Sequence, residues 1–159
     1  MVTNFRKNIN KDKKKCLFII LLLFVWFSLD MTGFSFANIT LVESAWNQVD
    51  GLWWLIFLTL FILFIFKEKF GKYLLSIFIL MWIIIQFNCH WYHTIFGTSV
   101  EKINSYNQYF RNTLHVISSS EKILIPDLYH IILHLLILIS LIILIRYIIY
   151  SLIKKNKKL

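Results

Sequence analysis

Residues 126–153 read PDLYHIILHLLILISLIILIRYIIYSLI, and this stretch decides the fold class. Between Leu135 and Ile145 its only polar residue is Ser140, and Pro126 at its start is a residue favoured in the first turn of a helix. As an α-helix the stretch is roughly 42 Å long, which exceeds the ~30 Å hydrocarbon core of a bilayer. We therefore predict a membrane-spanning helix here, one that tilts or protrudes at its end.

Three further apolar segments precede it, at about residues 16–37, 52–66 and 73–96. Hydrophobic residues make up 58% of the 159-residue chain, and mean hydropathy is +0.69. A soluble domain of this size has too much surface to bury such a fraction. The sequence therefore predicts an all-α integral membrane protein, in which residues 16–153 form a single membrane domain built as a four-span helical bundle.

The basic residues, which give a net charge of +9, indicate the orientation of this bundle. They concentrate in the tail at 1–15, between the second and third segments, and at the end of the chain, at Arg146 and in the tail at 154–159, whereas the other connections hold most of the acids. This alternation follows the positive-inside bias and predicts that both tails are cytoplasmic. No basic stripe interleaves with aromatic residues, so the expected partner is an anionic lipid head group rather than nucleic acid. The basic residues concerned are Arg6, Lys7, Lys11, Lys13, Lys14, Lys15, Lys67, Lys69, Lys72, Arg146, Lys154, Lys155, Lys157 and Lys158.

The first apolar segment has two interpretations. It is either a retained span or the core of a cleaved signal peptide, because a lysine-rich start and about 14 apolar residues precede a small-residue site ending at Ala37. Cleavage leaves three spans and does not alter the rest of the topology. Cys16 and Cys89 fall at opposite ends of the bundle on this topology, so they are not expected to form a disulfide.

Both outer connections are predicted to contain a helix. In residues 38–51, Thr40 and Glu43 have capping-box spacing before a helical pattern of apolar residues. In residues 97–125, Thr98 and Glu101 have the same spacing, and apolar residues then recur every three to four positions. The second pattern predicts an amphipathic helix at about 99–117, lying on the outer face of the bundle. Its apolar positions are Val100, Ile103, Tyr106, Phe110, Leu114 and Ile117.

All five histidines map to the outer side, and these positions are the strongest candidates for a site. His90 and His93 lie at the outer end of the third span, whereas His130 and His134 begin the fourth. If those two spans pack together, four imidazoles from facing helices approach one point, as in the metal and haem sites of helical bundles. The predicted ligands of a transition metal or haem are thus His90, His93, His130 and His134, with Asp127, His115 and Cys89 as supporting residues.

A structural interpretation of the histidines stands beside the metal hypothesis. Histidine is tolerated at a membrane interface when it makes one hydrogen bond, and neither histidine pair matches a defined motif such as H-E-x-x-H. His134 is the hardest to explain in this way, because it lies about 12 Å into its helix. Gln86, one turn below His90, is expected to hydrogen-bond a neighbouring helix.

The middles of the spans contain no charged residue, no broken helix and no inverted repeat, which argues against a self-sufficient channel or pump. The leading hypothesis is therefore a non-catalytic membrane component: a subunit, assembly factor or anchor that associates with other membrane proteins. The alternatives are a metal- or haem-binding redox subunit and a membrane-embedded enzyme acting on a lipid-linked substrate. The expected location is a bacterial plasma membrane, with an organellar inner membrane as the alternative.

Overall fold

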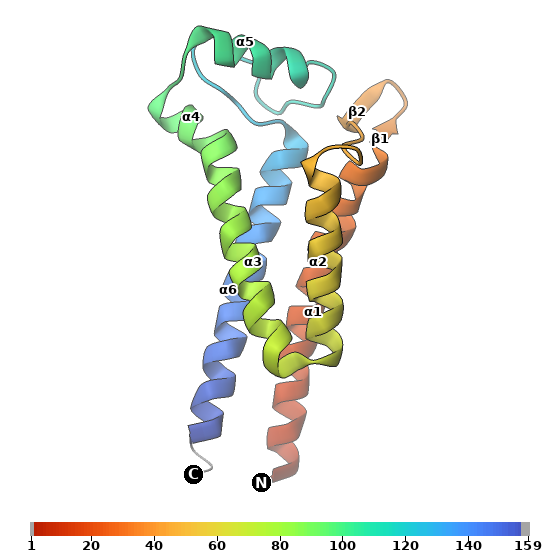
Figure 1. Cartoon of the computed structure of the whole chain (residues 1–159), viewed down its shortest axis with the longest axis vertical. Helices are drawn as coiled ribbons and strands as arrows, with labels where there is room; N and C mark the ends of the chain where they lie inside the picture. Colours follow the sequence, from red (N-terminus) through yellow and green to blue (C-terminus); the bar gives the residue numbers. More distant parts are fainter. Residues whose placement is uncertain (1, 157–159) are drawn as a thin grey trace.

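The computed structural model describes the backbone of residues 2–156 and the side chains of residues 11–153. Four long helices run between two ends of an elongated molecule (Figure 1). Both termini lie at one end, here called the terminal end, and a hairpin and a short helix cover the other, here called the capped end (Figure 1). The elements are α1 (Val2–Thr32), β1 (Phe34–Phe36), β2 (Ile39–Val42), α2 (Val49–Phe66), α3 (Glu68–Gln86), the π-helix η1 (Phe87–Trp91), α4 (Tyr92–Phe96), α5 (Val100–Tyr109) and α6 (Leu128–Asn156).

Four helical segments are long and apolar enough to cross a membrane by their length and composition. They are Lys11–Thr32, Val49–Phe66, Glu68–Phe96 and Leu128–Ile153. The predicted spans agree with these in number and order. The first one differs at both ends, because helix α1 begins well before Cys16 and stops at Thr32, where Gly33 adopts a positive φ of 72°. The basic side chains expected in residues 1–10 and 154–159 lie outside the described residues.

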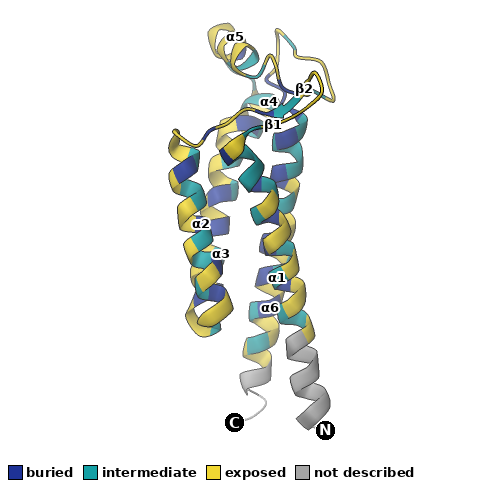
Figure 2. Ribbon diagram, turned by 90° about the vertical axis from the view of Figure 1, so that its right-hand side faces the viewer, coloured by how far each residue is buried: buried dark blue, intermediate teal, exposed yellow. Residues whose placement is uncertain are grey.

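The helices pack around an aromatic core. Phe27, Phe57, Phe78 and Trp82 are all buried, and the rings of Phe57 and Phe78 stack with centroids 5.9 Å apart. Figure 2 shows that large parts of the outward helix surfaces are exposed, and these surfaces are themselves rich in leucine and isoleucine. Helices that are apolar all round are typical of bundles surrounded by lipid.

A tight connection joins α2 to α3 at Lys67. Gly71 makes it possible, because a Cβ atom at this position would lie 2.4 Å from the Cα atom of Phe64. The two helices therefore approach more closely here than any larger residue would permit. This connection fixes the terminal end of the α2–α3 pair.

The expected helix in residues 38–51 is wrong for its first part, which forms strand β2 and pairs antiparallel with β1 in a two-stranded hairpin. Ala37 makes the turn at a positive φ of 52°, and the β-branched residues Ile39, Thr40 and Val42 favour a strand. The capping-box spacing of Thr40 and Glu43 therefore has no helix to cap. Only from Val49 does the chain become helical, as α2.

The outer helix expected at about 99–117 is also shorter than predicted. It spans Val100–Tyr109, and its N-cap is Ser99, whose side chain accepts a hydrogen bond from the backbone N–H of Lys102. The chain leaves the helix because Thr113 forms a bridge with Thr40 and the N–H of Leu114 donates to the Thr40 carbonyl. Pairing with the hairpin therefore competes with the helical pattern after Phe110.

Candidate functional site

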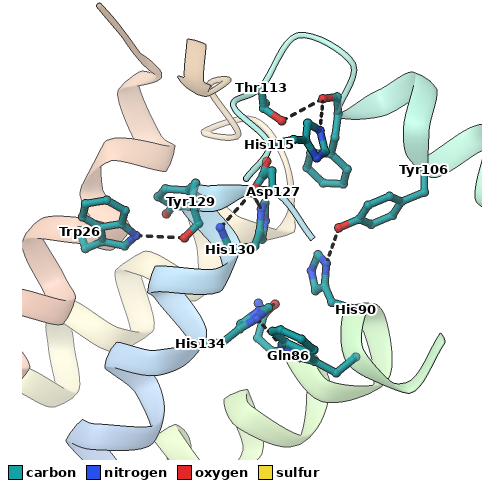
Figure 3. Close-up of polar contacts among 12 residues, drawn as sticks. Trp26, Gln86, His90, Tyr106, Thr113, His115, Asp127, Tyr129, His130 and His134 are labelled. Atoms are coloured by element: carbon teal, nitrogen blue, oxygen red, sulfur yellow. Dashed lines mark hydrogen bonds and ion pairs between the residues drawn. The ribbon is translucent and has the colours of Figure 1, made fainter. Parts of the chain in front are cut away.

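A π-helical turn positions His90, one of the two histidines of the third span. η1 interrupts the α-helix at Phe87–Trp91, and His90 within it is buried. Single π-turns inside α-helices often occur at functional sites, because the extra residue turns side chains toward a neighbour. Here the turn directs His90 and Trp91 toward the start of α6, which faces it across the bundle (Figure 3).

The start of α6 contains a buried carboxylate paired with a histidine. One Asp127 oxygen, Oδ1, accepts hydrogen bonds from the backbone N–H of His130 at 2.9 Å and from its ring Nδ1 at 2.7 Å. The Asp127 side chain is completely buried. Accepting the backbone bond makes Asp127 an N-terminal cap of the helix, and accepting the ring bond places the His130 proton on Nδ1. In the neutral form of the His130 ring, the Nε2 atom then carries the lone pair.

The ionised form of Asp127 is favoured despite its burial. Burial alone raises the pKa of this carboxyl, but the hydrogen bonds from His130 and the interaction with its ring outweigh it, so the pKa is lowered below its ordinary value. The pair is therefore a carboxylate with an imidazole that it orients.

Three imidazole rings gather beside this carboxylate. The ring centroid of His90 lies 4.7 Å from that of His130 and 5.1 Å from that of His134, and the last two are 6.1 Å apart (Figure 3). The structure thus brings together three of the four predicted metal ligands, with Asp127 beside them. They come from η1 and from the first two turns of α6.

The two nitrogens of His134 are both engaged. The indole N–H of Trp91 donates to Nδ1 at 2.7 Å, so the ring proton lies on Nε2 and is donated to the Gln86 side-chain oxygen at 2.9 Å. His134 therefore joins α6 to α3 and η1 as a neutral ring, and Gln86 bonds a neighbouring helix as expected. No nitrogen of His134 remains free for a metal ion in this arrangement.

The cap contributes Tyr106 to the site. Its hydroxyl lies 2.8 Å from Nδ1 of His90, which links α5 to the helix below it. Burial, with a smaller effect of the Asp127 charge, raises the pKa of Tyr106 above its ordinary value, so the phenol stays protonated. Tyr106 was expected only as an apolar position of the outer helix, and Trp91 is a further site residue that no sequence motif indicates.

The other predicted residues lie elsewhere. His93 Nε2 lies 2.7 Å from the Lys102 ammonium, His115 Nε2 lies 3.0 Å from the Phe110 carbonyl, and Cys89 is an exposed free thiol. Within the part of the chain that the structure describes, no group of three or more His, Cys, Asp or Glu side chains has a geometry that could hold a metal ion. Three of the predicted ligand rings therefore lie close together, but the described residues do not form the arrangement of ligands that a metal ion requires.

Several buried polar atoms at the capped end have no hydrogen-bond partner among the described residues. They include Oδ2 of Asp127, the hydroxyl of Tyr129 and Nδ1 of His115. Buried polar atoms are nearly always paired, so unpaired ones mark positions where water or a bound molecule completes the structure. The Thr113 side chain is close enough to Asp127 to contribute to the lowered pKa of this carboxyl, but its hydroxyl donates to the Phe110 carbonyl.

An apolar groove of about 270 Å³ opens between α3 and α6, and His134 is the one ring of the three that lines it. His134, Gln86 and Trp91 form its polar end, and Ile83, Leu135 and Leu138 line the rest. Leu135 and Leu138 are exposed on the outer surface of the bundle. A long apolar chain is therefore the type of ligand that fits this groove.

No known protein family, curated protein or solved structure matches this chain. The fold and the site therefore define its class on their own: a bundle of four long apolar helices with a buried imidazole–carboxylate site under a cap.

Proposed function

We propose that this protein is an integral membrane protein whose capped end faces outward and whose termini are cytoplasmic. The four apolar helices and their apolar outward surfaces support the first part. The position of Lys67, Lys69 and Lys72 at the same end as both tails supports the second, because basic connections stay inside. A bacterial plasma membrane remains the proposed location.

We further propose that the site at the capped end is an acid–base centre, and that the protein is a membrane-embedded enzyme acting on a lipid-linked substrate. The observation that carries this is the fully buried Asp127 carboxylate, which orients His130 and leaves its Nε2 free. A carboxylate that serves only as an N-terminal helix cap can lie at the surface and does not need to be buried. Burying it beside three imidazoles costs free energy, and such groups inside a membrane protein are functional candidates by default.

In this proposal His130 is the general base. Its Nε2 takes a proton from a water or hydroxyl as that oxygen forms a bond to the carbonyl or phosphoryl centre of the lipid. Asp127 stabilises the resulting imidazolium, and the same proton then passes to the leaving oxygen as its ester bond to that centre breaks. The ring centroid of His90 lies 4.7 Å from that of His130, and the Tyr106 hydroxyl lies beside its Nδ1. In this proposal His90 binds the reacting group. His134 acts differently, as a positioning residue held by Trp91 and Gln86.

The groove between α3 and α6 supports a substrate with a lipid tail. It runs along the outer helix surface and ends at His134, whose ring is next to both His90 and His130. A lipid lying in this groove would present its head group to the acid–base pair directly from the bilayer.

The test is turnover of lipid by purified protein. Protein in detergent is incubated with a total lipid extract of the expressing cells, and products are followed by mass spectrometry. A product made by the wild type and slowed about 100-fold or more in His130→Ala is expected. The matched control is His115→Ala, which removes a histidine at the same end outside the three rings. Equal turnover in both variants, or none by wild type on any lipid class, contradicts the proposal.

A second candidate, the non-catalytic subunit or anchor, is favoured by the apolar surface of the cap. Phe36, Ile39, Val116 and Ile117 are all exposed outside the four long helices, where a neighbouring membrane protein could cover them. This candidate predicts that extraction in mild detergent yields a complex heavier than the 19.1 kDa chain plus detergent. A monomer with its own turnover excludes it.

The proximity of the three rings also keeps the redox subunit as a candidate, although His134 must give up a hydrogen bond to ligate. Elemental analysis and absorption spectra of purified protein decide this. Stoichiometric metal or a haem band that is lost in His90→Ala supports it, and metal-free active protein excludes it.

A further inference from the structure

A second pocket lies at the opposite end of the molecule, between α1 and α6. It is an open cavity of about 800 Å³. Its floor includes Cys16 and Tyr147, both buried, and the Cys16 thiol donates a hydrogen bond to the Ile143 carbonyl at 3.6 Å. Two tightly packed helices therefore form the back of this pocket.

The walls of this pocket are basic. Lys11, Lys15 and Arg146 line it, with Asp12 as the only acid among its lining residues. Within the described side chains, none of these three basic groups forms an ion pair with an acid. The neighbouring acid that could neutralise them, Glu68, is already engaged elsewhere. The pocket therefore carries an uncompensated positive charge.

Glu68 is held by Lys13, which does not line the pocket, and by Tyr147 of the pocket floor. It forms an ion pair with Lys13 at 2.9 Å and accepts a hydrogen bond from the Tyr147 hydroxyl. These contacts tie α1 and α6 to the start of α3. Because Glu68 follows directly on the connection at Lys67, they also place the pocket at the level where α2 ends and α3 begins.

This level is the expected membrane boundary. Both α1 and α6 extend beyond the α2–α3 connection at the terminal end (Figure 1). The pocket is thus lined by basic groups and by Tyr150 where lipid head groups lie, and by Ile143, Ile149 and Ile153 along α6. Basic pockets between helices on the cytoplasmic side are typical binding sites for anionic lipid head groups.

We infer that this pocket is a specific binding site for one anionic phospholipid of the inner leaflet. Arg146 and the two lysines bind the phosphate, since guanidinium pairs with phosphate through two parallel hydrogen bonds. The acyl chains then lie along Ile143, which is about one helical turn closer to the middle of the bundle than Arg146. The inference rests on the proposed membrane location, but it does not depend on the acid–base site.

The test compares lipid binding to two charge-matched variants by native mass spectrometry of protein in detergent. The wild type is expected to bind phosphatidylglycerol in preference to phosphatidylcholine. The double variant Lys15→Gln/Arg146→Gln should weaken phosphatidylglycerol binding about tenfold or more. The control Lys67→Gln/Lys69→Gln removes the same charge at the same end outside the pocket and should change binding about twofold or less.

Equal losses in the two double variants, or equal binding of both lipids by the wild type, overturn the inference. Displacement of phosphatidylglycerol by soluble glycerol phosphate at equal concentration also overturns it, because the site then binds phosphate without the lipid. All four residues are exposed, and gel filtration checks that each variant is folded. If no lipid turnover is found but this binding is, only the acid–base proposal fails.

Discussion

Asp127 and His130 form a closed pair, in which one carboxylate oxygen accepts both the backbone N–H and the ring N–H of a histidine three residues later. The same residue thus caps α6 and orients the ring beside it through a hydrogen bond from Nδ1. Because both bonds depend on this side chain, its removal affects the helix and the site together.

The first prediction concerns Asp127→Ala. We expect it to lower the free energy of unfolding by about 2–3 kcal/mol, because the change removes a helix cap and leaves a buried imidazole N–H unpaired. Unfolding in mixed micelles measures the effect. Glu121→Ala, which removes an exposed acid at the same end, is the control and should cost about 0.5 kcal/mol or less. A loss for Asp127→Ala no larger than the control contradicts the pairing.

The second prediction is a pH dependence of stability. The folded-state pKa of Asp127 is lowered, so its stabilising contribution is complete well above about pH 4 and decreases as the pH falls below that value. The difference in unfolding free energy between wild type and Asp127→Asn should therefore shrink between about pH 6 and pH 3. A difference that grows toward low pH would mean that the folded protein prefers the protonated carboxyl.

The third prediction concerns the clamp formed by His134, Gln86 and Trp91. His134→Leu leaves the half-buried indole N–H of Trp91 and the half-buried amide oxygen of Gln86 unpaired, and we expect it to cost about 1–3 kcal/mol. A double-mutant cycle with Gln86→Leu should give a coupling energy of about 0.5–2 kcal/mol, as is usual for hydrogen bonds between membrane helices. Additive effects of the two changes would show that their contact contributes nothing.

The sequence predicts the helices well and the cap poorly. Long apolar segments have one stable form in lipid, so Leu128–Ile153 and its three counterparts follow from composition alone. At the capped end, short polar segments choose between helix and strand through tertiary contacts. The bridge between Thr40 and Thr113 stops the predicted helix, and nothing in the local pattern of either segment indicates it.

The candidate site, too, is predictable from the sequence only in part. That His90, His130 and His134 lie together follows from placing two antiparallel spans side by side. The exclusion of His93 does not follow, because the π-turn at Phe87–Trp91 changes which side chains face α6. Tyr106 could have been found only by knowing that α5 lies above the bundle, since its spacing fits an apolar stripe equally well.

The fourth prediction is that residues 1–37 remain part of the protein. Ile20, Leu23 and Phe27 of α1 are buried in the bundle, so their removal would open the core. Intact-mass measurement of protein purified from membranes is expected to give the full 19.1 kDa chain. A mass that corresponds to cleavage after Ala37 would show that the segment is a signal peptide and that the bundle has three spans.

The measurement that tests the whole account most directly is cysteine labelling from one side of the membrane. In a chain with Cys16→Ala and Cys89→Ser, single cysteines are placed at Ser118 in the cap and at Lys67 in the α2–α3 connection, both exposed positions. A membrane-impermeant maleimide should label Ser118→Cys in intact cells and Lys67→Cys only after permeabilisation. Labelling of both positions from the same side, or recovery of the chain in the aqueous fraction without detergent, would contradict four spans with the imidazole site on the outer face.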